Sequence, residues 1–211
     1  MDCMEFMKQF PDKFFDLAVV DPPYGIDKAF HATYRVAKYG QLNTVNDMKP
    51  TADYFNELFR VSKNQVIWGY NHMSDMLPNC KEFIFWYKHQ PVKTYSDGEL
   101  AWTSFGKCAR CFDYPFFGGV GKEKNRIHPT QKPEALYRWI YENYARGGYR
   151  ILDTHLGSGS SRIAAYHAGL DFYGCELDKE YFDKANARFE KEIHGVEVIN
   201  DQTITQQSLF E

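Results

Sequence analysis

Residues 21–24 read DPPY and directly follow the apolar run of residues 17–20. The run predicts a buried strand that ends on the carboxylate of Asp21. Pro22 and Pro23 fix their own φ angles and keep the chain extended, so the acceptors around Asp21 are held in place. Tyr24 adds a flat ring beside them. Acceptors next to a ring suit a planar group that carries an NH₂. The alternative is a proline-rich turn that closes a strand.

A second candidate site is the glycine loop, residues 153–161, which reads DTHLGSGSS. Gly157 and Gly159 allow a sharp turn and a close ligand, while the serines can cap a helix or offer hydroxyl groups. Glu176 follows roughly 20 residues later, where open α/β sheets bind a ribose diol. The pattern predicts a nucleoside-containing cofactor. No lysine follows the glycines, which argues against ATP, and the loop is too short for the NAD pattern GxGxxG. The alternative is a tight turn that simply needs glycine.

Strands and helices alternate along the chain in a way that would place both motifs at one sheet edge. Apolar spacing predicts helices at 49–64 and 133–148, a helix through 168, and a last helix with apolar residues at 182, 185, 189 and 193. Strands are predicted at 16–20, 65–70, 82–89, 99–106, 149–153 and 171–177. This order predicts an α/β fold, a doubly wound, mostly parallel sheet with helices on both faces.

The domain organisation follows from length and composition. A chain of 211 residues with 44% hydrophobic residues suits one domain. We expect this domain to span residues 1–197, with residues 103–128 as a compact irregular loop. Residues 198–211 show no core pattern and predict a flexible tail.

Charge and cysteine content narrow the functional classes. The formal net charge is −3, so a nucleic acid would have to meet a local basic patch. The candidate residues for phosphate contact are Lys107, Arg110, Lys122, Lys124 and Arg126. The alternative is that they belong to an ordinary solvated surface.

The chain lacks both a membrane-length apolar run and a secretion signal, which predicts a cytoplasmic protein. Its five cysteines suit a reducing compartment. Cys108 and Cys111 form a CxxC, but no second pair follows and His128 has no partner at ligand spacing, so we expect no metal site.

Taken together, the motifs resemble those of the DNA amino-methyltransferases that use S-adenosylmethionine. The DPPY box matches at residues 21–24, the D-x-F-x-G-S-G-T/S loop at 153–160, and the H-P-T-Q-K-P run at 128–133. The DPPY box precedes the glycine loop, as in the permuted beta subgroup, and the resemblance spans roughly residues 1–193. RNA and protein methyltransferases with a similar box generally place the cofactor loop first. The resemblance implies a Rossmann-like methyltransferase fold and S-adenosylmethionine as cofactor.

The resemblance also implies roles for individual residues. Asp2 and Cys3 would contact the cofactor adenine, Leu177 would pack on it, Glu176 would bind the ribose, and Lys132 would help to enclose the methionine end. The residues that would line the cofactor loop are Asp153, His155, Gly157, Ser158, Gly159 and Ser160. His155 stands where the family usually has phenylalanine, which implies different stacking on the cofactor.

The reaction implied is direct methyl transfer to an exocyclic amine of double-stranded DNA. The catalytic residues would be Asp21, Pro22, Pro23 and Tyr24: the Asp21 carboxylate and the Pro22 carbonyl accept the amine hydrogens, and the flipped-out base stacks on Tyr24. Aspartate at the first position is usual for adenine N6 enzymes and serine for cytosine N4 enzymes. The alternatives are a cytosine N4 enzyme, an RNA or protein amide methyltransferase, and an inactive homologue that binds cofactor or DNA. Methylation of a ring carbon is excluded because the sequence has no Pro-Cys pair.

The tail adds one candidate partner. Residues Gln206 to Phe210 read QQSLF, which is similar to the Q-x-S/D-L-F peptide that docks on the bacterial sliding clamp. Leu209 and Phe210 would be the apolar anchors. The alternatives are that these residues fold back onto the domain or that the match arose by chance.

Overall fold

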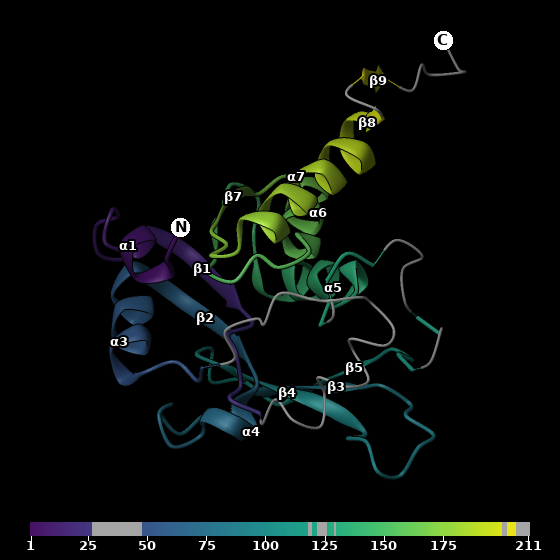
Figure 1. Ribbon diagram of the computed structural model, residues 1–211. Coiled ribbons are helices and arrows are strands. Elements are labelled where there is room, and N and C mark those ends of the chain that lie inside the picture. Colours follow the sequence, from purple (N-terminus) through teal and green to yellow (C-terminus); the bar gives the residue numbers. More distant parts are fainter. Residues whose placement is uncertain (27–47, 118–119, 122–125, 129, 200–201, 206–211) are drawn as a thin grey trace.

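The computed structural model describes the chain except for residues 27–47, 118–119, 122–125, 129, 200–201 and 206–211 (Figure 1). Its centre is a seven-stranded sheet of order β5-β3-β4-β2-β1-β6-β7. The strands are β1 (Phe15–Val20), β2 (Ser62–Trp68), β3 (Phe83–Tyr87), β4 (Gly98–Thr103), β5 (Arg110–Asp113), β6 (Arg150–Asp153) and β7 (Asp171–Gly174). Strand β4 is antiparallel to β2 and β3, and the remaining pairings are parallel. The predicted mostly parallel sheet is confirmed.

Helices cover both faces of the sheet because β1 is apolar on both sides. Leu17 and Val19 belong to a core with α5 (Glu134–Tyr144) and α6 (Ser160–His167). Ala18 and Val20 face the other core, with α1 (Cys3–Met7), α3 (Ala52–Val61) and α4 (Tyr70–Met73). Continuous apolar strands of this kind are typical of sheets buried on both faces. The doubly wound arrangement is therefore confirmed.

Helix α7 (Lys179–His194) lies beside α6 and extends past the body of the domain (Figure 1). Its first turn is capped by Asp178, whose carboxylate accepts from the backbone N–H of Glu180 at 2.8 Å and of Tyr181 at 3.2 Å. The helix ends at Gly195, where φ is +63°. A left-handed glycine is a common helix terminator.

Two segments that the sequence predicted to be irregular contain short strands. Within the expected loop 103–128, residues Arg110–Asp113 form β5, which pairs with β3 because Phe112 is buried against Trp86 and Trp139. In the expected tail, β8 (Val196–Ile199) and β9 (Gln202–Thr205) form an antiparallel hairpin that continues from α7 (Figure 1). These strands form through backbone hydrogen bonds to a neighbouring strand, although their sequences show no apolar pattern that predicts a strand.

Helices α1 and α4 are short and were not predicted. Helix α1 begins after Asp2, whose carboxylate accepts from the backbone N–H of Met4 at 2.9 Å and of Glu5 at 3.2 Å. Over the part of the chain that the structure describes, no helix combines the length and apolar character that a bilayer crossing requires.

Candidate active site

The two sequence motifs meet at the carboxyl edge of three neighbouring strands. Strand β6 lies between β1 and β7 in the sheet. Asp21 follows β1, Asp153 ends β6, and Glu176 comes two residues after β7. The carboxyl ends of parallel strands form the ligand edge in open α/β sheets. The fold therefore brings the DPPY box and the glycine loop together, as the sequence predicted.

The carboxylate of Asp21 is held on both oxygens. The hydroxyl of Tyr24 donates to Asp21 Oδ1 at 2.6 Å, and the ammonium of Lys132 pairs with Oδ2. Lys132 Nζ also lies 3.2 Å from Glu99 Oε2, and Lys88 pairs with the other oxygen of Glu99. Asp21, Lys132, Glu99 and Lys88 thus form an ion-pair cluster in which carboxylates and ammonium groups alternate.

Electrostatics favour the charged forms of Lys132 and Glu99. Burial lowers the pKa of Lys132, but Asp21 and Glu99 raise it by more, so the net shift is upward. Burial raises the pKa of Glu99, but Lys132 and Lys88 outweigh burial and bring it to about 2. Burial, followed by the charge of Asp21, raises the pKa of Tyr24 well above its ordinary value. The Tyr24 hydroxyl therefore stays protonated and acts as a donor.

The ring of Tyr24 is fixed by close packing. It stacks on His72, with ring centroids 5.2 Å apart and an interplanar angle of 15°. On another side it touches Gly69, where a Cβ would lie 2.2 Å from Tyr24 Cε1. Gly69 also has a φ of +80°, so glycine is required there for two reasons. The sequence predicted the ring as a flat surface but not the contribution of its hydroxyl.

The glycine loop turns sharply and is tied to its neighbours by hydrogen bonds. Gly157 and Gly159 have φ values of +51° and +75°. The carboxylate of Asp153 accepts from the backbone N–H of His155 at 3.0 Å and from the hydroxyl of Ser161. Burial raises the pKa of Asp153 to about 7, although these two hydrogen bonds oppose the shift. Asp153 therefore stabilises the turn through these two hydrogen bonds.

Glu176 is oriented by the loop it faces. Its Oε2 accepts from the backbone N–H of Gly157 at 2.8 Å, and its Oε1 accepts from that of Asp178 at 3.0 Å. A carboxylate has about four lone-pair sites, so each oxygen can accept one further hydrogen bond. The carboxylate is thus preorganised for two more donors, such as the two hydroxyls of a ribose.

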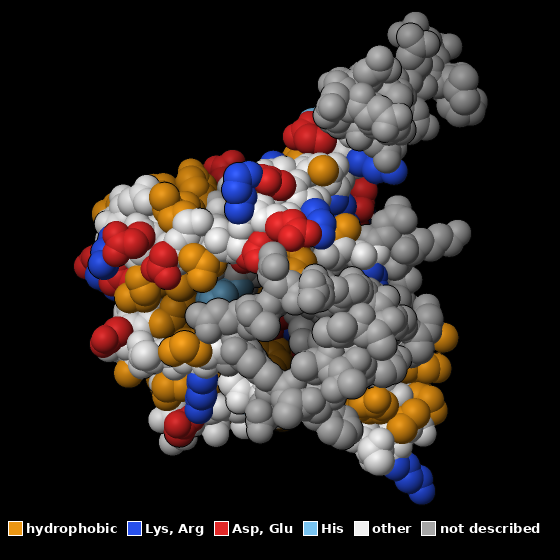
Figure 2. Space-filling view, viewed as in Figure 1, with side chains coloured by type: hydrophobic (Ala, Val, Ile, Leu, Met, Phe, Trp, Pro, Cys, Tyr) orange, Lys and Arg blue, Asp and Glu red, His pale blue; other side chains and the backbone are white. Residues whose placement is uncertain are grey.

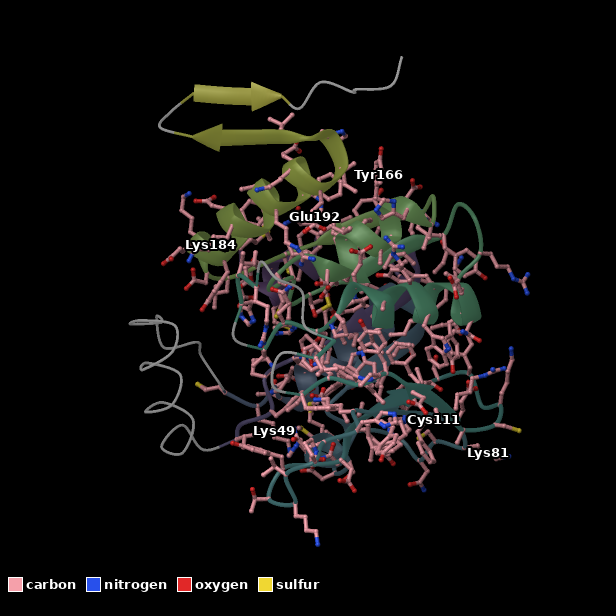
Figure 3. The ribbon with its side chains drawn as sticks, turned by 90° about the vertical axis from the view of Figure 1, so that its right-hand side faces the viewer. Lys49, Lys81, Cys111, Tyr166, Lys184 and Glu192 are labelled. Carbon is pink, nitrogen blue, oxygen red and sulfur yellow. The ribbon has the colours of Figure 1, made fainter. Side chains whose placement is uncertain are left out.

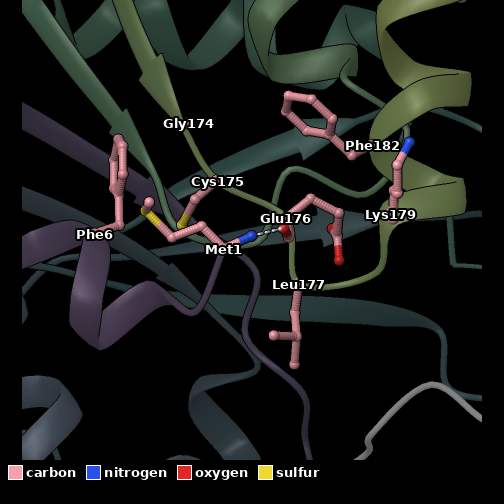
Figure 4. A pocket seen from close by; sticks show the side chains of 8 residues that line it. All are labelled: Met1, Phe6, Gly174, Cys175, Glu176, Leu177, Lys179 and Phe182. Carbon is pink, nitrogen blue, oxygen red and sulfur yellow. Dashed lines mark hydrogen bonds between the residues drawn. The ribbon is translucent and has the colours of Figure 1, made fainter.

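A pocket of about 340 Å³ adjoins Glu176 (Figure 4). The residues that line it are Met1, Phe6, Gly174, Cys175, Glu176, Leu177, Lys179 and Phe182. The N-terminal ammonium of Met1 donates to the carbonyl of Glu176 at 2.6 Å. The predicted adenine-contact residues Asp2 and Cys3 follow Met1 in the chain but do not line this pocket. Leu177 is 62% exposed and offers apolar surface at its edge. The combination of apolar side chains with one carboxylate suits an adenosine.

The other predicted loop residues face inward. Arg188 Nη1 donates to the carbonyl of Ser158 at 3.1 Å and to the hydroxyl of Ser160 at 2.9 Å, and both serines are buried. They support the loop from α7. His155 contacts Tyr54 edge-on, with centroids 5.6 Å apart. Burial lowers the pKa of His155 to about 4, so its ring is neutral at pH 7.

Three charged residues of the site make contacts that the sequence did not predict. Lys132, which the resemblance places at the methionine end of the cofactor, pairs with Asp21. Glu99 and Lys88 were not singled out at all. The available signal was a glutamate at the start of the predicted strand 99–106, directly before apolar residues.

The predicted phosphate contacts are spread apart. Exposed Lys107 and Arg110 lie at the start of β5, four strands from β1, which is roughly 20 Å at ~4.8 Å per strand. Arg126 lies 5.9 Å from the ring of Phe116, the ring that Lys88 Nζ also approaches at 5.9 Å. Arg126 therefore lies near the ion-pair cluster, whereas Lys122 and Lys124 lie outside the described residues.

The surface of α7 carries paired charges of both signs. Lys179 pairs with Asp183, and Lys184, which Figure 3 labels, pairs with Glu180; Figure 2 shows both signs interspersed there. Such a surface carries no net basic field for phosphates. Among the residues that the structure describes, no three His, Cys, Asp or Glu side chains are grouped as a metal site would require.

Comparison with known proteins decides the family. The model of the family described as DNA methylase (N6_N4_Mtase) matches residues 33–187, about three quarters of the chain. The chain belongs to this family. The type II methyltransferase M.HpaI of Haemophilus parainfluenzae is 23% identical over 95% of this chain and 76% of its own length.

Two solved methyltransferase structures share the fold. The M1.HpyAVI–SAM complex superposes with a TM-score of 0.60 at 23% identity and covers 89% of this chain and 96% of its own. The PvuII DNA methyltransferase, described as cytosine-N4-specific, gives a TM-score of 0.59 at 14% identity, covering 88% of this methylase and 83% of its own chain. The likenesses confirm the methyltransferase fold and leave the choice between the two amines open.

Proposed function

We propose that this methylase transfers a methyl group from S-adenosylmethionine to the N6 amine of a flipped-out adenine in double-stranded DNA. The observation that carries the proposal is the placement of the Asp21 carboxylate at the strand edge next to the glycine loop. Aspartate at the first position of the DPPY box, where the cytosine enzymes usually have serine, favours adenine over cytosine.

The residues of the pocket fit the proposed cofactor. Glu176 retains two acceptor positions for the ribose hydroxyls, and Leu177 and Phe182 offer exposed apolar surface for the adenine. S-adenosylmethionine, when bound, would supply an activated methyl group, whose bond to sulfur breaks as the bond to the amine nitrogen forms. Sulfur keeps the electron pair of the broken bond, and the methylated nitrogen then releases one hydrogen as a proton to solvent.

The DPPY box would act on the amine. Its acceptors, the Asp21 carboxylate and the Pro22 carbonyl, take hydrogen bonds from the two amine hydrogens, which raises the nucleophilicity of the nitrogen. Pro22 and Pro23 keep the box extended, and Tyr24 provides the ring on which a flipped base stacks. Because Tyr24 is already packed against His72 and Gly69, its orientation is set before the base arrives.

Nucleoside analysis of methylated products tests this function. The protein is incubated with S-adenosylmethionine carrying a labelled methyl group and, in parallel, with duplex DNA, RNA and protein, and the labelled product is digested. We expect label in N6-methyldeoxyadenosine. Label in N4-methyldeoxycytidine would assign the other amine, label in RNA or protein would refute a DNA substrate, and no label with bound cofactor would identify an inactive homologue.

Glu176→Gln should weaken cofactor binding by about tenfold, because an amide offers one acceptor oxygen where the carboxylate offers two. Calorimetric titration with S-adenosylmethionine measures the dissociation constant. Glu180→Gln, on the exposed first turn of α7, is the matched control and should bind normally. Unchanged affinity in Glu176→Gln would contradict the proposal that Glu176 binds the ribose of the cofactor.

The segment Gln206 to Phe210 lies outside the described residues, so its proposed role rests on sequence. Docking on a sliding clamp would tether the enzyme to DNA and raise its local concentration there. Labelled peptide 200–211 should bind a bacterial clamp at micromolar concentration. Equal binding by the peptide with Leu209→Ala and Phe210→Ala would refute this partner.

A further inference from the structure

The ion-pair cluster draws its four members from separate parts of the chain. Asp21 follows β1, Lys88 follows β3, Glu99 lies in β4, and Lys132 precedes α5. Lys132 is only 7% exposed, and its ammonium also lies 5.6 Å from the ring of Trp68. The cluster is therefore assembled by the sheet as a whole and is largely screened from water.

Fold stability does not account for this cluster. Removing two ammonium groups and two carboxylates from water costs free energy, and well-packed apolar residues usually stabilise such a position as well or better. The surroundings of Lys132 would suit apolar replacements, since Trp68 and Trp86 form the adjoining core. A cost of this kind is typical of sites where charge serves function.

The contacts of Asp21 show what the cluster does locally. Lys132 engages Oδ2 and Tyr24 engages Oδ1, so the carboxylate cannot rotate without losing a partner. Each oxygen still has about one lone-pair site to offer. Held in this way, the carboxylate presents its remaining acceptor positions in a fixed direction.

We propose that Lys132 and Glu99 are positioning residues that hold the Asp21 carboxylate in a fixed orientation, aimed at the target amine. The proposal rests on the proposed role of Asp21 as acceptor for the amine hydrogens. Lys132 acts directly on Asp21. Glu99 acts through Lys132, and Lys88 balances the second carboxylate while its ammonium rests 4.5 Å from the ring of Trp86.

Charge balance explains why Lys132 needs Glu99. The methyl donor is a sulfonium cation, and the amine becomes positively charged as it is methylated, so an unbalanced ammonium beside Asp21 would oppose the reaction. Glu99 neutralises Lys132 at 3.2 Å. The negative charge of Asp21 can then act on the developing cation, while Lys132 still fixes its geometry.

The experiment compares variants in single-turnover methyl transfer to DNA, alongside cofactor affinity by calorimetry and thermal unfolding. Lys132→Met should lower the rate by about tenfold or more, because Asp21 loses the partner that fixes its orientation. Lys132→Arg should restore most of the rate, since a guanidinium can keep the ion pair with Asp21. Cofactor affinity should change by less than about threefold.

Glu99→Gln should also slow the reaction, because an unneutralised Lys132 places a positive charge beside an amine that becomes cationic as it is methylated. Glu82→Gln is the matched control: Glu82 is also buried in the sheet, where it accepts from the Tyr144 hydroxyl and the Lys107 N–H at 2.8 Å each. Its rate should match that of the wild type.

Several results would overturn the inference. Loss of cofactor affinity in parallel with the rate in Lys132→Met would make Lys132 a cofactor ligand. Wild-type rates in both Lys132→Met and Glu99→Gln would leave the cluster without a role in the reaction. If Lys132→Met does not fold, Glu99→Gln decides, and a wild-type rate in that variant refutes the proposal. Full activity in Asp21→Ala would instead refute the proposed role of Asp21, a separate failure.

Discussion

Asp21→Ala should reduce the rate of methyl transfer by about 100-fold or more while cofactor affinity stays within a few fold of wild type. The carboxylate lies at the carboxyl edge of β1, whereas the pocket beside Glu176 is built from β7, α7 and the N-terminus. Removing Asp21 therefore takes away the acceptor for the amine hydrogens and leaves the cofactor pocket intact. Single-turnover methylation of duplex DNA gives the rate, and calorimetry gives the affinity.

Two companion variants make this test specific. Asp21→Asn keeps the shape of the side chain but removes its charge and one acceptor oxygen, so it should be nearly as slow as Asp21→Ala. Asp183→Ala, which removes only an exposed ion pair with Lys179 on α7, should methylate DNA at the wild-type rate. A parallel loss of cofactor affinity and rate in Asp21→Ala would assign Asp21 a structural role in the fold.

The parts of the site that could be predicted are those that local sequence determines. An apolar run that ends in Asp21 and a glycine loop between a strand and a helix each define a strand end. Strand ends in a parallel sheet share one edge. That rule placed Asp21, Asp153 and Glu176 together without any knowledge of side-chain contacts, and the structure agrees.

The side-chain pairs could not be predicted, because they depend on tertiary packing. Lys132 pairs with Asp21 across 111 positions of sequence, and Glu99 joins them from an antiparallel strand that lies two places from β1 in the sheet. Periodicity shows which face of a strand is buried but not which charge it meets there. The same limit applies to Ser160. Its motif predicted a contact with the cofactor, but the structure shows that its hydroxyl accepts a hydrogen bond from Arg188 of α7.

Short edge elements escaped prediction for a related reason. Strand β5 has four residues, three of them exposed, so its sequence carries almost no alternation. Its order comes from backbone pairing with β3 and from a single buried ring, Phe112. Such strands are determined by the neighbour they pair with.

Asp153 leads to the largest expected effect on stability. The side chain is 2% exposed, and burial raises its pKa in the folded protein to about 7, against hydrogen bonds from Ser161 and the His155 N–H that favour the charged form. An unfolded aspartate has a pKa of about 4. Between these values the folded state keeps a proton that the unfolded state has released, so the free energy of unfolding falls as pH rises.

We therefore expect Asp153→Asn to be more stable than the wild type at pH 8 and to show no such gain at pH 4. Three pKa units at ~1.4 kcal/mol each set an upper bound of about 4 kcal/mol for the gain. Urea unfolding of both proteins across this pH range measures it. Asp16→Asn is a control of opposite sign. Burial raises the pKa of Asp16, but the Arg150 N–H and Lys63 outweigh burial, so the pKa is lower than its ordinary value. This variant should therefore lose stability at pH 8. A stability difference between Asp153→Asn and wild type that does not vary with pH would show that Asp153 has the same pKa in the folded and unfolded states, with the Ser161 and His155 hydrogen bonds cancelling the effect of burial.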